Sequence, residues 1–70
     1  MSKDEFKKYI ITIGFEQVYI FYFYNKYRIS LYDNEYELFK EEKMIGRFDY
    51  NDLKPLHKIS RRYKLKYLLE

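Results

Sequence analysis

His57 is the one imidazole in this 70-residue chain, and so the side chain best suited to general acid or base catalysis near neutral pH. The chain has no cysteine, no glycine-rich phosphate loop and no serine in a tight glycine-flanked turn. On a C-terminal helix His57 would fall at the edge of the apolar stripe, where a lone histidine packs far more often than it catalyses. We therefore expect no enzyme activity and no catalytic residue.

Carboxylates are the remaining groups that could do chemistry, as ligands for a hard cation. They cluster in the middle of the chain, at Glu41, Glu42, Asp49 and Asp52. Their spacing matches no loop that encircles calcium, and zinc would lack thiolate and imidazole ligands. We interpret these acids as a solvated turn and a helix cap, and expect no metal and no cofactor.

Charge is distributed unevenly around a net value of +3. Residues 33–52 hold seven acids and three bases, a net −4, whereas residues 53–70 hold six bases and one acid, a net +5. A basic face of this kind suits nucleic acid or an acidic partner, unless it packs against the acidic strands of the same chain or of a second copy. Its residues are Lys54, Lys58, Arg61, Arg62, Lys64 and Lys66.

The first element predicted is a helix over residues 3–13. Ser2 and Glu5 have the spacing of a capping box. An apolar stripe follows at helical spacing, and Gly14 stands where a left-handed residue would end the helix, with Phe15 folding back on Ile10. The stripe consists of Phe6, Tyr9, Ile10 and Ile13.

Strands are predicted next, because Val18–Tyr24 is apolar throughout and rich in aromatic and β-branched residues. A turn at Asn25-Lys26 would pair this strand with Tyr27–Tyr32. That register places Tyr24 opposite Tyr27, Tyr22 opposite Ile29, Ile20 opposite Leu31 and Tyr19 opposite Tyr32. Further strands at Tyr36–Lys40 and Met44–Phe48, with a turn at Glu41–Lys43, would complete an antiparallel meander.

The tail is predicted to be helical, with Asn51 or Asp52 as the cap and Pro55 in the first turn. Its core-facing stripe is Leu53, Leu56, Ile59, Tyr63 and Tyr67. Leu65 and Leu69 fall on the basic side, so residues 64–69 either form a second contact surface or run extended. The chain is thus expected to be one small α+β domain over residues 1–70, a three- to four-stranded antiparallel β-meander flanked by an N-terminal and a C-terminal helix.

This order of elements resembles the α-β-β-β-α layout of double-stranded-RNA-binding domains and is similar to that of the small HicA toxins. The resemblance is carried by Gly14-Phe15 after the first helix and by Asp52-Leu53-Lys54-Pro55 before the last. The strands lack the histidine on which HicA ribonucleases depend, and the basic residues run through the middle of the last helix rather than cluster at its start. The resemblance therefore implies a fold and no nuclease activity.

Both faces of the predicted sheet are apolar, although an antiparallel sheet usually has one polar face. The aliphatic face carries Val18, Ile20, Tyr22, Ile29, Leu31, Leu38 and Ile45, and the aromatic face Tyr19, Phe21, Phe23, Tyr32, Phe39 and Met44 with Arg28, Ser30 and Glu37. One helix could cover each face, or both could cover the aliphatic face. The second arrangement leaves a bare aromatic surface for a partner protein, a second copy or stacked bases. The candidate protein-docking residues are Tyr19, Phe21, Phe23, Arg28, Tyr32 and Phe39.

These observations favour a non-enzymatic protein-binding module. Phe, Tyr, Ile, Asn and Lys fill 36 of the 70 positions, which indicates AT-rich coding and a low-GC bacterium or its mobile elements. We expect a small phage- or mobile-element-encoded inhibitor or regulator, of the anti-defence type, that occludes a host protein. The alternatives are nucleic-acid binding through the basic face and a structural homodimer. No signal peptide or membrane-length apolar run is visible, which predicts a cytoplasmic protein without a membrane partner.

Overall fold

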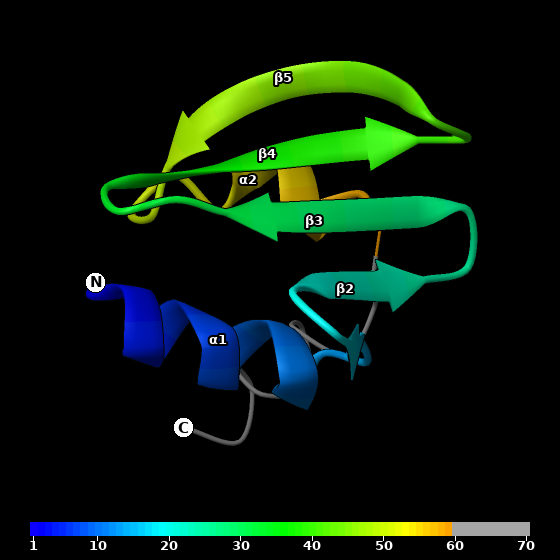
Figure 1. Cartoon of the computed structure of the whole chain (residues 1–70). Coiled ribbons are helices and arrows are strands. Elements are labelled where there is room, and N and C mark those ends of the chain that lie inside the picture. The colour runs from blue at the N-terminus through cyan, green and yellow to red at the C-terminus, as the bar shows by residue number, and fades with distance from the viewer. Residues whose placement is uncertain (60–70) are drawn as a thin grey trace.

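A computed structural model describes residues 1–59. The chain forms an N-terminal helix, then one antiparallel sheet with the strand order β1-β2-β3-β4-β5, then a short C-terminal helix (Figure 1). The prediction of a small α+β meander is confirmed, with five strands in place of three or four. The elements are α1 (Lys3–Thr12), β1 (Glu16–Val18), β2 (Phe21–Tyr24), β3 (Tyr27–Leu31), β4 (Glu35–Lys40), β5 (Lys43–Asp49) and α2 (Lys54–His57).

Local signals set both ends of α1 as predicted. The Ser2 hydroxyl accepts from the Glu5 N–H at 3.2 Å, and the Glu5 carboxylate accepts from the Ser2 N–H at 3.1 Å. After the C-terminal turn, Gly14 has φ 123°, and the Phe15 N–H donates to the Ile10 carbonyl at 2.9 Å. The predicted stripe of Phe6, Tyr9, Ile10 and Ile13 is buried.

The sheet register is correct for the central hairpin and wrong for the first strand. Tyr24 pairs with Tyr27 and Tyr22 with Ile29, as expected. The predicted strand Val18–Tyr24, however, breaks at Tyr19-Ile20, where a two-residue turn brings Val18 opposite Phe21. The predicted pairs Ile20–Leu31 and Tyr19–Tyr32 therefore do not form.

The break is caused by a left-handed backbone conformation at Tyr19, which the residue types do not indicate. Tyr19, the first residue of the turn, has φ 62°, a left-handed conformation that glycine normally supplies at such a position. A turn of Tyr and Ile carries no sequence signature, so an unbroken apolar strand was the natural expectation. Val18 and Ile20, predicted for the core-facing side, are 53% and 72% exposed.

A second irregularity lies in the β4–β5 hairpin. Both residues of its turn, Glu41 and Glu42, have positive φ values of 51° and 68°. A bulge next to Phe39 shifts the register, so that Phe39 pairs with Met44 but Leu38 pairs with Gly46. Ile45, predicted for the core, is the extra residue and stays half exposed.

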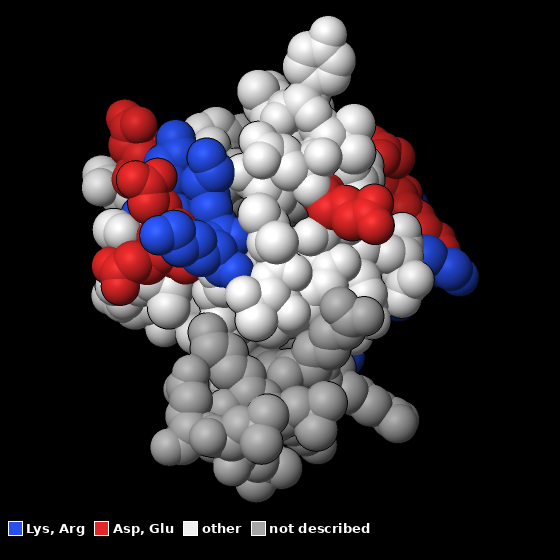
Figure 2. All heavy atoms as spheres, turned by 90° about the horizontal axis from the view of Figure 1, so that it is seen from below, with Lys and Arg blue, Asp and Glu red and all other residues white. Residues whose placement is uncertain are grey.

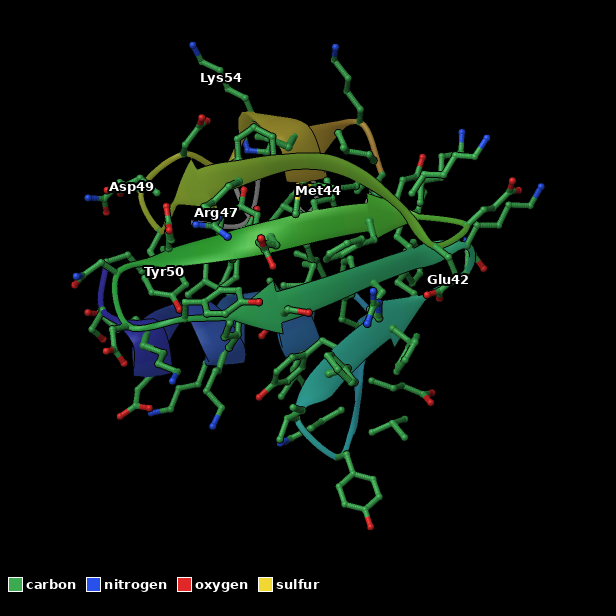
Figure 3. The ribbon with its side chains drawn as sticks, turned by 45° about the horizontal axis from the view of Figure 1, so that its top comes forward. Glu42, Met44, Arg47, Asp49, Tyr50 and Lys54 are labelled. Atoms are coloured by element: carbon green, nitrogen blue, oxygen red, sulfur yellow. The ribbon has the colours of Figure 1, made fainter. Side chains whose placement is uncertain are left out.

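Both helices pack against the same face of the sheet. Core residues of α1 and Leu56 of α2 form one cluster with Tyr22, Ile29 and Leu38 of the sheet, and both helices lie behind the sheet in Figure 3. The alternative with one helix on each face is therefore wrong for residues 1–59. Rings rather than branched chains fill much of this core: the Phe6 ring lies 4.4 Å from that of Tyr36 and 4.9 Å from that of Tyr50.

The C-terminal helix begins near the predicted position. The prediction of Asn51 or Asp52 as the cap is wrong, because Leu53 is the N-cap residue and no side chain caps the helix. The Asp52 carboxylate instead accepts from the Lys54 N–H at 3.3 Å, just before the helix. Leu56 is buried, and Leu53 and Ile59 pack on the core. The predictions for Tyr63, Tyr67 and residues 64–69 lie outside the described residues. Within residues 1–59, neither helix has the length and apolar character to cross a membrane.

Candidate protein-docking face

The side of the sheet turned away from both helices is here called the open face. Register assigns its side chains, because residues opposite one another in an antiparallel pair point to the same side. They are Glu16, Val18, Phe21, Phe23, Arg28, Ser30, Glu35, Glu37, Phe39, Met44, Arg47 and Asp49, with Tyr32 at the end of β3. An ionic half and an apolar half can be distinguished on it.

The ionic half is built on Glu37, whose side chain is only 5% exposed. Arg47 donates to the same Glu37 oxygen through Nε at 3.2 Å and Nη2 at 2.6 Å, and to Glu35 through Nη1 at 3.2 Å. A hydrogen bond from Tyr32, together with the Arg47 contacts, lowers the pKa of Glu37, and the same bond to Glu37 raises the pKa of Tyr32. Each of the three guanidinium nitrogens of Arg47, labelled in Figure 3, thus donates to a carboxylate within the fold.

The apolar half surrounds Arg28. Its guanidinium carbon lies 4.3 Å from the ring centre of Phe39 on one neighbouring strand and 4.8 Å from that of Phe21 on the other. Phe23, 37% exposed, meets Phe21 edge to face at 6.4 Å. The rings hold Arg28 in place. The nearest described carboxylate is that of Glu42, whose Oε2 lies 3.6 Å from Nη2 of Arg28.

The turn between β1 and β2 extends the apolar half beyond the sheet. Val18 lies opposite Phe21, and the two turn residues that follow, Tyr19 and Ile20, are 91% and 72% exposed. Three consecutive exposed apolar residues at a hairpin tip are unusual in a soluble protein. The tip adjoins the apolar half through Val18, whereas Tyr19 and Ile20 also line a hollow with Lys3 and Lys7 of α1.

The predicted docking residues fall into three groups. Phe21, Phe23, Arg28 and Phe39 come together in the apolar half. Tyr32 belongs to the ionic half, where the guanidinium carbon of Arg47 lies 5.5 Å from its ring centre. Tyr19 was expected within the sheet and instead occupies the hairpin tip. Three further exposed apolar residues were not predicted as docking residues. They are Val18 and Met44 on the open face and Ile20 at the hairpin tip.

Only two residues of the predicted basic face can be placed. Lys54 and Lys58 are exposed and line a hollow of about 410 Å³ together with Ile45, Phe48 and Pro55. The other members, Arg61, Arg62, Lys64 and Lys66, lie outside the described residues. On the α1 side of the molecule, Lys, Arg, Asp and Glu gather at the two flanks of a broad uncharged area (Figure 2).

Glu41 and Glu42 form the solvated turn expected of them, whereas neither Asp49 nor Asp52 caps α2. The Glu41 carboxylate pairs with Lys26 at 3.2 Å, and Asp49 accepts from the Asn51 N–H at 2.8 Å. No group of three His, Cys, Asp or Glu suited to a metal occurs within residues 1–59. His57 is half-buried on α2, beside the core.

No family model, no curated protein and no solved structure matches the chain. The resemblance to RNA-binding domains and HicA toxins therefore finds no support in these comparisons. The five-stranded sheet also departs from the three strands of that layout.

Proposed function

We propose that this chain is a non-enzymatic protein-binding module that docks through the apolar half of its open face and blocks a surface of its partner. The observation that carries the proposal is a set of partly exposed rings around Arg28 on the sheet side that neither α1 nor α2 covers. Aromatic side chains and arginine are the residue types enriched in the energetic centres of protein interfaces.

The backbone strain at Tyr19, in the hairpin tip, supports the same function. A tyrosine in the left-handed region is disfavoured by about 1–2 kcal/mol, and Tyr19 regains none of this by burial because its side chain is almost fully exposed. Strain that the isolated fold does not need is a common feature of binding sites. Tyr19 is therefore proposed to insert into a pocket of the partner.

The biological class is proposed on composition rather than on geometry. A short chain with AT-rich coding, many aromatic residues and no site for catalysis suits a phage- or mobile-element-encoded inhibitor that acts on a host protein in the cytoplasm. Occlusion requires only a tight, specific contact, which a chain of 70 residues can provide through one face.

Affinity capture from the source organism with three immobilised forms of the chain tests the proposal. Wild type and Lys58→Glu are expected to retain the same protein, and Phe23→Glu is expected to lose it, since a charge there enters the apolar half. Retention should change little between about 50 and 200 mM salt. Circular dichroism of each form before capture verifies that it is folded.

Two other results would each contradict the proposal. Nucleic acid retained by wild type, lost with Lys58→Glu and lost steeply with salt would identify the basic face as the functional surface. A chain that sediments as a dimer, and as a monomer after Phe21→Glu, would assign the open face to self-association.

A further inference from the structure

Arg28 and Arg47 lie on the same face of the sheet but differ in how their donors are used. Arg47 makes three hydrogen bonds to carboxylates at 2.6–3.2 Å. Arg28 has a side chain only 20% exposed and a buried Nε with no hydrogen-bond partner among the described residues. Its one carboxylate neighbour within residues 1–59, Glu42, stands 3.6 Å from Nη2, beyond ordinary hydrogen-bond length.

The surroundings of Arg28 favour a charged acceptor. A guanidinium flanked by rings is partly desolvated, so an anion that reaches it meets little competition from water. Its planar fork of terminal N–H groups matches the two oxygens of a carboxylate. Phe21 and Phe39 fix the fork in position before any ligand arrives, which lowers the entropic cost of binding.

The charge around Arg28 favours a protein carboxylate over a phosphate as the anion that it binds. Residues 33–52, which include β4 next to the strand of Arg28 and the edge strand β5 beyond it, carry a net charge of −4. A single carboxylate is repelled there less than a doubly charged phosphate or a nucleic-acid backbone, and apolar side chains beside it would also contact the rings.

We propose that Arg28 recognises an acidic side chain, Asp or Glu, flanked by apolar residues on the partner, and that Glu42 occupies its place weakly when no partner is bound. This inference rests on the proposed function and specifies the chemistry of the contact. A carboxylate of the partner can displace Glu42 from Arg28, because the Glu42 side chain is 79% exposed and its carboxylate is too distant for a strong hydrogen bond.

The test follows the side-chain Nε–Hε signals of Arg28 and Arg47 by NMR on the full chain. The probe is the peptide acetyl-Leu-Glu-Leu-Glu-Leu-amide, with its glutamine counterpart and inorganic phosphate as controls. The glutamate peptide is expected to shift the Arg28 signal with saturation in the millimolar range and to leave Arg47 unchanged. A comparable shift of Arg28 by the glutamine peptide or by phosphate, or no shift, would overturn the inference.

Glu42→Gln provides a second readout that does not depend on altering Arg28. Loss of the competing carboxylate should strengthen binding of the glutamate peptide about two- to five-fold, the range of an exposed ion pair. Unchanged or weaker binding would contradict the displaceable role.

Capture with Arg28→Gln separates this inference from the function on which it rests. A partner lost with both Phe23→Glu and folded Arg28→Gln supports both. A partner lost with Phe23→Glu but retained by Arg28→Gln would leave the docking face standing and refute recognition by Arg28.

Discussion

Arg47 binds the buried carboxylate of Glu37 through Nε and Nη2, at 3.2 and 2.6 Å, across the β4–β5 pair. Because both groups lie on the open face, this ion pair makes one half of an otherwise apolar surface polar. It also joins an edge strand to its neighbour by side chains as well as by the backbone ladder. The proposed docking surface is thereby confined to the other half, around Arg28.

The Glu37–Arg47 pair should make stability depend on acid pH. Hydrogen bonds from Tyr32 and Arg47 place the pKa of Glu37 below its ordinary value of 4.5, so the pair stabilises the fold above pH 4.5 and loses this effect as the pH falls through the lower, folded-state pKa. Glu37→Gln should lower the free energy of unfolding at pH 7. The wild-type and variant curves should then converge toward pH 3, as measured by urea unfolding.

Glu5 acts in the same pH window, because hydrogen bonds from the Ser2 backbone and side chain lower its pKa. Glu5→Gln should therefore remove a separate part of the acid dependence. The double variant should show the sum of the two changes, since distant sites are additive. A Glu37→Gln curve that runs parallel to that of wild type from pH 7 to pH 3 would refute the assigned role of Glu37.

Tyr19→Gly is expected to stabilise the chain while it weakens binding. Glycine relieves the left-handed strain at φ 62°, and the exposed ring loses no buried contact. The expected gain is about 0.5–1 kcal/mol in the free energy of unfolding. The matched control is Asn25→Gly in the next turn, at φ 52°, which should change stability by only a few tenths of a kcal/mol, because asparagine tolerates this region. Loss of stability in Tyr19→Gly would mean that the ring supports the fold itself.

At least three tyrosines within residues 1–59 should ionise late in a spectrophotometric titration. Burial raises the pKa of Tyr36 and of Tyr50, and the hydrogen bond to Glu37 raises that of Tyr32. Because these folded-state pKa values exceed the ordinary value of 10, the stability that they contribute is present below pH 10 and lost as the pH rises above it. Ionisation of all ten tyrosines in one step near pH 10 would contradict this assignment.

Tyr36→Phe isolates one of the three. The Tyr36 hydroxyl donates to the Asp52 carbonyl at 2.6 Å and so joins β4 to the segment that leads into α2. Its removal should cost about 1 kcal/mol and abolish one late-ionising group in the same titration. A late fraction of unchanged size in this variant would show that Tyr36 ionises with the exposed tyrosines.

Two phenylalanines on opposite faces of the sheet should respond differently to truncation. Phe6 is fully buried against Tyr36 and Tyr50, so Phe6→Ala should cost about 3–5 kcal/mol, enough to unfold a chain of this size. Phe23 is 37% exposed, and Phe23→Ala should leave the chain folded in circular dichroism and weaken partner capture. Unfolding of Phe23→Ala would place this ring in the core.

Sequence reasoning succeeded where the determining signals are local. The capping box at Ser2 and Glu5, Gly14 after α1 and the Asn25-Lys26 turn each depend on neighbouring residues, and each lies where predicted. The alternation of Arg28 and Ile29 then assigned the two faces of β3 correctly.

It failed where the backbone adopts a conformation that its residues do not favour. Nothing in Val18–Tyr24 indicates a turn at Tyr19, and neither Glu41 nor Glu42 is a usual left-handed residue. The fifth strand and the exposed tip were missed for this reason. The β-bulge that leaves Ile45 half exposed is likewise a property of the paired strands rather than of any one segment.

The most direct test of the docking face is its accessibility in the full chain in solution. A soluble gadolinium chelate broadens the NMR signals of exposed protons, so the Met44 methyl and Phe23 ring signals should broaden strongly while those of Phe6 and Phe15 persist. The same contrast should hold at every protein concentration, because neither α1 nor α2 covers this surface. Protection of Met44 and Phe23 equal to that of Phe6 in the dilute protein would contradict an open face.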